Sequence, residues 1–254
     1  MNIEQNFVVS NSIVRKIWGD SDMILFIFAG AAAEFSLNKA VDWLYFTGKL
    51  PEDPLGRLFS TVSYANSIIF ANENDANKAI DKISSIHKTI EDNRGASIPD
   101  WAYRDVLYML IDYTIAAHEL LETRLSLAHK KEVYNVFYRM GIRMGIKELP
   151  YTYTEWVTDR IKHINENLAV SKYTPHLFEQ YKKNLGNFRY YIMLKVQSLL
   201  LPEEVRKLLK MKKGLSFYTI ISLYKLLKMA RLHNQIRSVL FPKKYKVEIQ
   251  GLNR

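Results

Sequence analysis

The sequence contains no cysteine in its 254 residues. Disulfide bonds, iron–sulfur clusters and thiolate metal sites are therefore excluded. A metal would have to be held by histidine, carboxylate, tyrosine, methionine or lysine side chains. Low-complexity segments, internal repeats and Gly/Ser linkers are also missing, which favours one domain over residues 1–254.

Segments typical of membrane targeting or insertion are lacking as well. The first twenty residues do not have the basic start and apolar stretch of a signal peptide, which predicts an intracellular, cytoplasmic protein. The longest uncharged apolar segment, residues 23–33, ends at Glu34 and is too short to span a bilayer. We expect this segment to form a buried helix.

The positive charge of the chain is concentrated at its C-terminal end. Residues 203–254 hold thirteen Lys and Arg against three Glu, which accounts for the whole net charge of +10. Within this basic extension the cations alternate with large aliphatic and aromatic residues at helical spacing, so it could bind an anionic membrane surface or pack on the core with a solvated face. No nucleic-acid motif is present, and we expect no nucleic-acid partner.

Helical periodicity dominates the chain, and 48% hydrophobic with 13% aromatic residues is enough to build a large core. The fold class predicted is all-α, with about eight to ten helices. Thr152 and Glu155 have the spacing of a helix capping box. Helices are expected at about 22–46, 55–70, 74–90, 100–127, 130–145, 153–169, 175–200, 202–212 and 215–240.

Several catalytic signatures are absent. The chain has no Glu-x-x-His pair of di-iron bundles, no phosphate-binding Gly-rich loop and no G-x-S-x-G nucleophile. The segment HELLE, residues 118–122, resembles a zinc-protease helix, but its fifth residue is Glu122 where the second imidazole is needed. Zinc chemistry is thus disfavoured.

Two of the six histidines lie on apolar helix faces. His118 shares its face with Ile111, Ile115 and Leu121, and His87 shares its own with Ile80 and Ile83. Each could be a hydrogen-bonded core residue. Taken together, on neighbouring helices joined by a short loop, they could instead supply two axial ligands to one haem iron. His129 and His163 are expected to be solvated.

The sequence resembles the family that joins bacterial latex-clearing proteins (rubber oxygenases) with the fungal endoplasmic-reticulum-bound oxygenase of mycophenolic acid synthesis. The resemblance extends from about residue 23 to 242. It depends on the order and spacing of several short segments, namely FAGAAAEF, DPLGRLFST, IHKTI, GIRMG, LPEEVR and a final LFP.

This resemblance implies an all-α domain with a globin-like core that binds haem b and uses dioxygen on an apolar, isoprenoid or lipid-like substrate. It implies His118 as one axial iron ligand. If the alignment of this helix with the family pattern is shifted by a few residues, Asp112 or Tyr113 takes its place. It implies His87 as the ligand on the other face, with Lys88 as its competitor. Arg57 is implied as a partner of the haem propionates.

Two departures from the family pattern favour other functions. Ser84 stands where the family has an arginine, and the segment SYANSIIF, residues 63–70, lacks the distal glutamate of the rubber oxygenases. One alternative is a bis-histidine haem protein that carries electrons or haem without catalysis. Another is a haem-free helical protein that binds a membrane or a partner through its basic extension.

Overall fold

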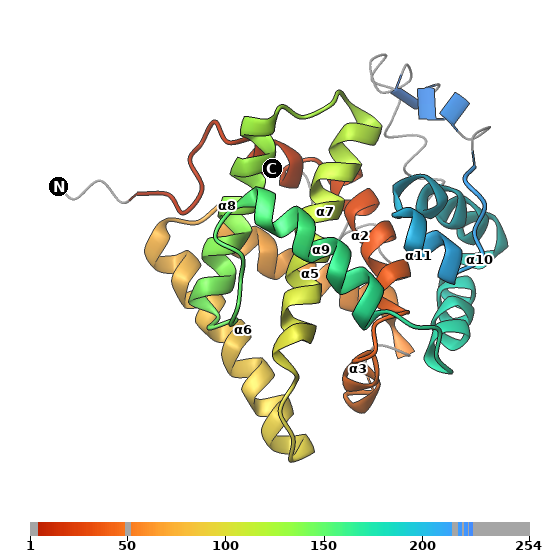
Figure 1. The fold of residues 1–254 in the computed structure, drawn as a ribbon, viewed down its shortest axis with the longest axis horizontal. Coiled ribbons are helices and arrows are strands. Elements are labelled where there is room, and N and C mark those ends of the chain that lie inside the picture. The colour runs from red at the N-terminus through yellow and green to blue at the C-terminus, as the bar shows by residue number, and fades with distance from the viewer. Residues whose placement is uncertain (1–4, 49–51, 215–217, 220, 223, 226–254) are drawn as a thin grey trace.

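The structure is a computed structural model and describes residues 5–48, 52–214, 218–219, 221–222 and 224–225. Throughout this part of the chain the regular structure is helical, with two isolated β-bridges, which confirms the predicted all-α fold class (Figure 1). The helices are α1 (Ile13–Trp18), α2 (Ser21–Phe35), α3 (Asp42–Phe46), α5 (Pro54–Ile69), α6 (Glu73–Arg94), α7 (Asp100–Leu121), α8 (Leu127–Arg143), α9 (Tyr153–Asn167), α10 (Tyr173–Leu200) and α11 (Glu203–Leu208).

Many of these helices begin at a side chain that accepts a hydrogen bond from the first turn. Asp20 does so for α2, Asn72 for α6 and Ser126 for α8. At α9, Thr152 accepts from the Glu155 amide while the Glu155 carboxylate accepts from the Thr152 amide, so the predicted capping box is confirmed. Because such caps satisfy amides that have no partner within the helix, they fix where each helix starts.

The helix predicted over residues 22–46 is interrupted, and the reason is a contact with a distant segment. The chain after Phe35 turns and pairs with the segment at the end of α9. The Lys39 amide donates to the Asn167 carbonyl, and the Ala169 amide donates to the Leu37 carbonyl at 2.8 Å. This short bridge competes with helical hydrogen bonding between α2 and α3. It also places Asn38 beside α7 and α9.

Two further boundaries differ from the prediction. Helix α7 ends at Leu121, short of residue 127, because the Leu125 amide is bound by the Glu119 carboxylate and Ser126 begins the next helix. Helix α10 contains a kink at Gly186, whose φ of 76° is readily adopted only by glycine. Most of the helix predicted at 215–240, and most of the basic extension, lies outside the described residues.

Helices α2 and α7 form the centre of the molecule and pack most extensively against each other (Figure 1). The short helix α1, which the sequence did not predict, closes one side of this core. Its Trp18 is fully buried against Phe28 and Phe137 and donates a hydrogen bond to Thr114 at 3.2 Å. Burial of an indole with its N–H satisfied accounts for the position of such a short helix.

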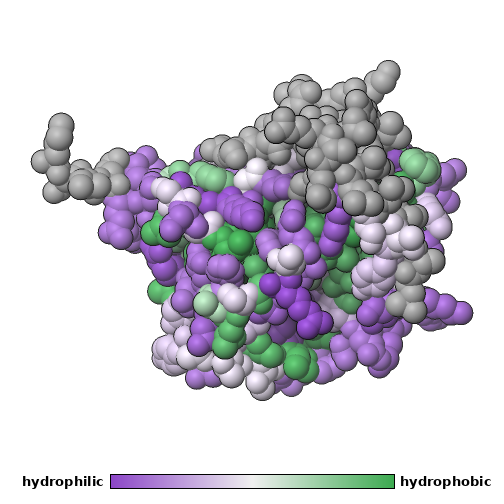
Figure 2. Space-filling model, turned by 90° about the horizontal axis from the view of Figure 1, so that it is seen from above, coloured by the Kyte–Doolittle hydropathy of each residue, from purple (hydrophilic) through white to green (hydrophobic). Residues whose placement is uncertain are grey.

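Among the described residues, none of the helices has the length and apolar content needed to cross a bilayer. The face of the molecule seen in Figure 2 carries apolar residues interspersed with hydrophilic ones.

Candidate functional site

His118 lies near the C-terminal end of α7 and is buried, with a relative exposure of 4%. Its Nδ1 atom is 3.2 Å from the carbonyl oxygen of Thr123. Because a carbonyl oxygen only accepts, Nδ1 must carry the hydrogen of this bond, and the lone pair of the neutral ring is on Nε2. That Nε2 atom is buried and has no hydrogen-bond partner within the described residues.

Burial lowers the pKa of His118 below its ordinary value of 6.5, and the nearby charge of Lys16 acts in the same direction. The Thr123 carbonyl, Glu122 and Glu119 oppose this effect without reversing it. The ring is therefore neutral near pH 7, as a metal-binding imidazole must be.

His87 lies on α6 in a separate environment. Its ring packs on Tyr103 of α7 with 5.2 Å between ring centroids, and its Nδ1 atom is buried without a partner in the part of the chain described. Burial lowers the pKa of His87, the nearby guanidinium of Arg57 lowers it further, and Glu91 opposes both.

The structure does not bring His87 and His118 together. Tyr103, which contacts His87, precedes His118 on the same helix by fifteen residues. At 1.5 Å per residue this is about 22 Å along the helix axis. Two axial ligands must bind one iron atom from opposite sides of one ring, so this arrangement does not permit the predicted pair. Helices α6 and α7 meet near the loop that connects them, where His87 contacts Tyr103, and His118 is far from that loop.

Lys88 and Arg57 have different positions. Lys88 follows His87 directly on α6, so its side chain points in a different direction, away from the core. It is exposed and pairs with Asp92 at 2.9 Å. Lys88 is therefore not placed to compete with His87. Arg57 of α5 is partly buried, and burial lowers its pKa. Its charge lowers the pKa of His87, which lies on the helix packed against α5.

Asp112 and Tyr113, the other candidates on α7, belong to a buried ionic cluster with Glu34 of α2 and Arg160 of α9. Arg160 donates to both Glu34 oxygens at 2.6 Å and to Asp112 at 3.0 Å, and the Tyr113 hydroxyl donates to Glu34 at 2.6 Å. Burial raises the pKa of Tyr113 well above 10, with Glu34 adding to the effect. The Tyr113 hydroxyl and the Oδ2 atom of Asp112 are thus engaged within the protein.

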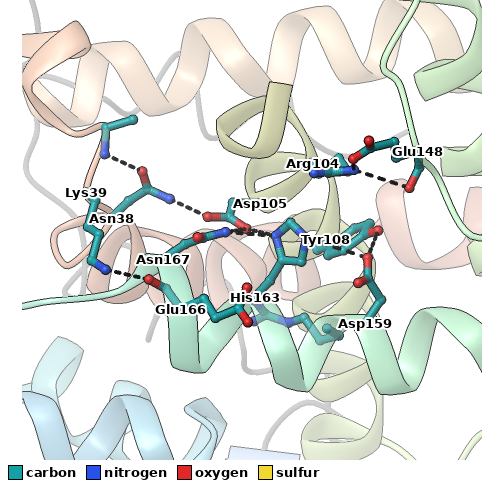
Figure 3. Close-up of polar contacts among 12 residues, drawn as sticks. Asn38, Lys39, Arg104, Asp105, Tyr108, Glu148, Asp159, His163, Glu166 and Asn167 are labelled. Carbon is teal, nitrogen blue, oxygen red and sulfur yellow. Dashed lines mark hydrogen bonds and ion pairs between the residues drawn. The ribbon is translucent and has the colours of Figure 1, made fainter. Parts of the chain in front are cut away.

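A second polar cluster joins α9 to α7 (Figure 3). His163 is buried, and its Nδ1 atom contacts Asp105, which also accepts from Asn38 at 2.9 Å and from Asn167 at 3.2 Å. The expectation that His163 is solvated was therefore wrong. Its spacing gave a usable signal: Trp156, Arg160, His163 and Asn167 recur every three or four residues and form the inner face of α9.

These observations bear on whether the chain could hold a haem group. A buried imidazole whose Nδ1–H is fixed by a carbonyl, and whose Nε2 lacks a partner, has the donor chemistry of a single axial iron ligand. His118 meets this description, and the described residues group no three histidine or carboxylate side chains as a metal cluster of another kind. His118 therefore has the donor chemistry that a haem bound through one histidine would need.

Comparison with known proteins agrees with the resemblance seen in the sequence. Residues 15–232 match the family described as ER-bound oxygenase mpaB/B'/Rubber oxygenase, catalytic domain. No curated protein and no solved structure matches the chain. The match covers most of the chain, and the protein therefore belongs to this oxygenase family.

Proposed function

We propose that this protein is a haem b-dependent oxygenase that acts with dioxygen on an apolar, isoprenoid or lipid-like substrate, and that His118 binds the iron. The observation that carries the proposal is the buried Nε2 atom of His118, which has no partner within the described residues. Leaving a buried polar atom without a hydrogen bond costs about 1–3 kcal/mol. A bound iron would remove that cost.

The surroundings of His118 support its role as the ligand over the other residues of α7. Its ring is held by the Thr123 carbonyl, and its lowered pKa keeps it neutral. Asp112 and Tyr113, in contrast, are committed to Arg160 and Glu34. Binding iron through the Tyr113 hydroxyl or the Oδ2 atom of Asp112 would break a hydrogen bond inside the core.

Membership of an oxygenase family supports the reaction class. Haem, when bound, would supply the iron at which dioxygen is activated. The chain's own part is to hold that iron through His118, to keep the imidazole in one tautomer and to exclude water with the apolar residues around α7.

The test is the absorption spectrum of protein expressed with haem supply. We expect a Soret band in the wild type that is lost or shifted in His118→Ala and retained in His87→Ala. His87 is the matched control, since it is also an imidazole with a buried unpartnered nitrogen but lies near the other end of α7. No Soret band, or a band unchanged by His118→Ala, would contradict the proposal.

Carbon monoxide distinguishes this function from a bis-histidine electron carrier. An iron held by His118 alone has an open position in the reduced protein, so carbon monoxide should shift the Soret band. A reduced spectrum that carbon monoxide leaves unchanged would indicate a second protein ligand and a non-catalytic haem protein.

A further inference from the structure

Helix α10, at the right-hand edge of the molecule in Figure 1, carries aromatic side chains that are in contact with water. Phe188 is 61% exposed and Tyr191 is 55% exposed, and at three residues apart they lie on one face of the helix. Lys195 lies one turn further along, with its ammonium group 5.1 Å from the centre of the Tyr191 ring. These three residues form what we call the outer face of α10.

The outer face is not the one that attaches α10 to the core. Beyond the kink at Gly186, the buried residues are Val196, Gln197, Ser198 and Leu200. Gln197 donates a hydrogen bond of 3.0 Å to the Ala29 carbonyl of α2. The helix is therefore held through its other side. Single exposed apolar residues are common on protein surfaces, so the aromatic pair alone would not indicate a partner.

The charge around the aromatic pair is of one sign. Residues 180–202 contain four Lys and Arg and no Asp or Glu. Lys182 and Lys183 are exposed, and no ion pair joins either of them to another residue of the described part of the chain. Five residues separate Lys183 from Phe188, which is at most about 18 Å of chain. The exposed aromatic rings and the unpaired cations therefore lie close enough to meet the same surface.

Helix α9 shows a different combination. Val157 and Ile161 are also exposed and also share a helix face, but α9 carries Glu155, Asp159 and Glu166 along with its two cations. Exposed apolar residues among charges of both signs are ordinary protein surface. This pair on α9 is a suitable control for the pair on α10.

A surface with cations and no carboxylates selects an anionic partner. A second copy packed through the same face would bring lysine against lysine, and the basic extension, with a net charge of +10, is repelled as well. Anionic lipids satisfy both parts of the surface. Aromatic rings enter the boundary between headgroups and acyl chains, while lysine side chains extend along the apolar surface to reach the phosphates.

We propose that the outer face of α10 docks on an anionic membrane surface. Phe188 and Tyr191 enter the edge of the acyl layer, and Lys182, Lys183 and Lys195 lie at the phosphate headgroups. This docking requires no haem and does not depend on the function proposed for His118. Its success or failure can therefore be separated from the Soret experiment.

A single dye tests the location. Because the chain has no cysteine, one introduced cysteine carries one environment-sensitive dye. Asn187→Cys places it at an exposed position beside Phe188 and keeps both aromatic rings. We expect its emission to shift to the blue with phosphatidylglycerol vesicles, to be quenched by brominated acyl chains, and to change much less with phosphatidylcholine vesicles. Tyr151→Cys, on the loop before α9 and 83% exposed, is the control whose emission should stay constant.

Two outcomes of the dye experiment overturn the proposal. One is vesicle binding that leaves the dye at residue 187 unchanged, as binding through the basic extension alone would do. The other is an equal shift of the dye at residues 187 and 151, which would indicate contact without a preferred face.

Paired serine substitutions test the aromatic rings. Phe188→Ser with Tyr191→Ser should weaken binding of the whole chain to phosphatidylglycerol vesicles at least about tenfold, because burial of even one such ring contributes that much. The control, Val157→Ser with Ile161→Ser, removes two exposed apolar side chains from α9 and should leave binding unchanged. Binding that survives the α10 pair, or that both pairs weaken equally, contradicts the proposal.

Paired glutamine substitutions test the cations. Lys182→Gln with Lys183→Gln should weaken vesicle binding by about tenfold to thirtyfold, as two cations near an anionic surface provide. Lys82→Gln with Lys131→Gln removes the same charge from exposed positions on α6 and α8 and should have a smaller effect. An equal loss in the two pairs would mean that net charge alone drives binding, which is evidence against docking through α10.

A single-stranded oligonucleotide tests the other anionic partner, since bases stack on aromatic side chains beside cations. Nucleic-acid binding of this kind follows a groove, whereas Phe188 and Tyr191 stand on a convex helix surface. We expect the serine pair on α10 to change vesicle binding and not oligonucleotide binding. The reverse result would assign the outer face of α10 to nucleic acid and overturn the proposal.

Discussion

Arg160 of α9 donates two hydrogen bonds of 2.6 Å to the two carboxylate oxygens of Glu34 of α2. Both side chains are almost completely buried, and Asp112 and Tyr113 of α7 complete the cluster. Burial alone would lower the pKa of Arg160, but the attraction of Glu34 and Asp112 outweighs it and the net change is upward. The ion pair therefore connects three helices of the core.

We predict that Arg160→Met lowers the free energy of unfolding by about 3–5 kcal/mol, because it leaves the Glu34 carboxylate buried without its partner. Urea denaturation followed by circular dichroism measures this. Adding Glu34→Gln to the same variant should restore part of the loss, since it removes the isolated charge. A loss below about 1 kcal/mol in the single variant would contradict the burial of this pair, because only a pair in contact with water can be broken at so small a cost.

An exposed pair of the same geometry should behave differently. Arg143 of α8 binds both Asp81 oxygens, at 2.8 and 2.6 Å, but the two side chains are about half exposed. Water screens this pair, so we expect Arg143→Met to lower the urea midpoint much less than Arg160→Met does in the same experiment. If the two arginine variants are equally destabilised, burial does not determine how much stability the loss of an ion pair costs.

Gly30 permits the close approach of α2 to α7. A Cβ atom at this position would lie 2.3 Å from the Tyr113 ring, which is buried and bound to Glu34. We expect Gly30→Ala to displace that ring and to lower the thermal midpoint, at a cost on the order of 1–3 kcal/mol or more.

The companion variant checks the cause of that loss. Tyr113→Leu removes the ring that the new methyl group meets, so the double variant should lose less than the sum of its two single variants. Strict additivity would show that the methyl group does not act through Tyr113.

The stability of the protein should depend on pH through His87. Its folded-state pKa is lowered from 6.5, by burial and by Arg57, so the folded ring stays neutral at a pH where the unfolded ring takes up a proton. Stability from this source is complete above about pH 6.5 and decreases as the pH falls through the window between 6.5 and the lowered pKa, with a slope of at most about 1.4 kcal/mol per pH unit.

Comparing wild type with His87→Phe at pH 5 and at pH 7.5 isolates the effect of this one ring. We expect the variant to lose less stability than the wild type when the pH is lowered, because the phenyl ring does not titrate. Glu91 and Tyr103, which face His87 in both proteins, contribute equally to each measurement. An identical pH dependence in the two proteins would contradict the lowered pKa.

Much of the fold follows from local sequence. The all-α class, the start of α9 at Thr152 and the burial of His118 were predicted from periodicity and capping residues, and the structure confirms them. These features depend on residues within one or two turns of each other. Local patterns are sufficient to find them.

Features that depend on distant contacts were not predictable in the same way. The break after Phe35 arises from pairing with the end of α9, more than a hundred residues away. Likewise, nothing local to His163 shows that its partner is Asp105, and polar residues at helical spacing were interpreted as a solvated face. The distance between His87 and His118 depends on how α6 is oriented relative to α7, which their separation in the sequence does not determine.

The inner face of α9 has a consequence for how the molecule opens. Arg160 binds α2 and α7, while His163 and Asn167 bind Asp105 of α7, so moving α9 away would leave Glu34 and Asp105 as isolated charges in the core. Partial opening at α9 alone is therefore costly. The amide hydrogens of α2, α7 and α9 should therefore exchange slowly and together, as one cooperative unit. The outer helices can open on their own, so their amide hydrogens should exchange sooner.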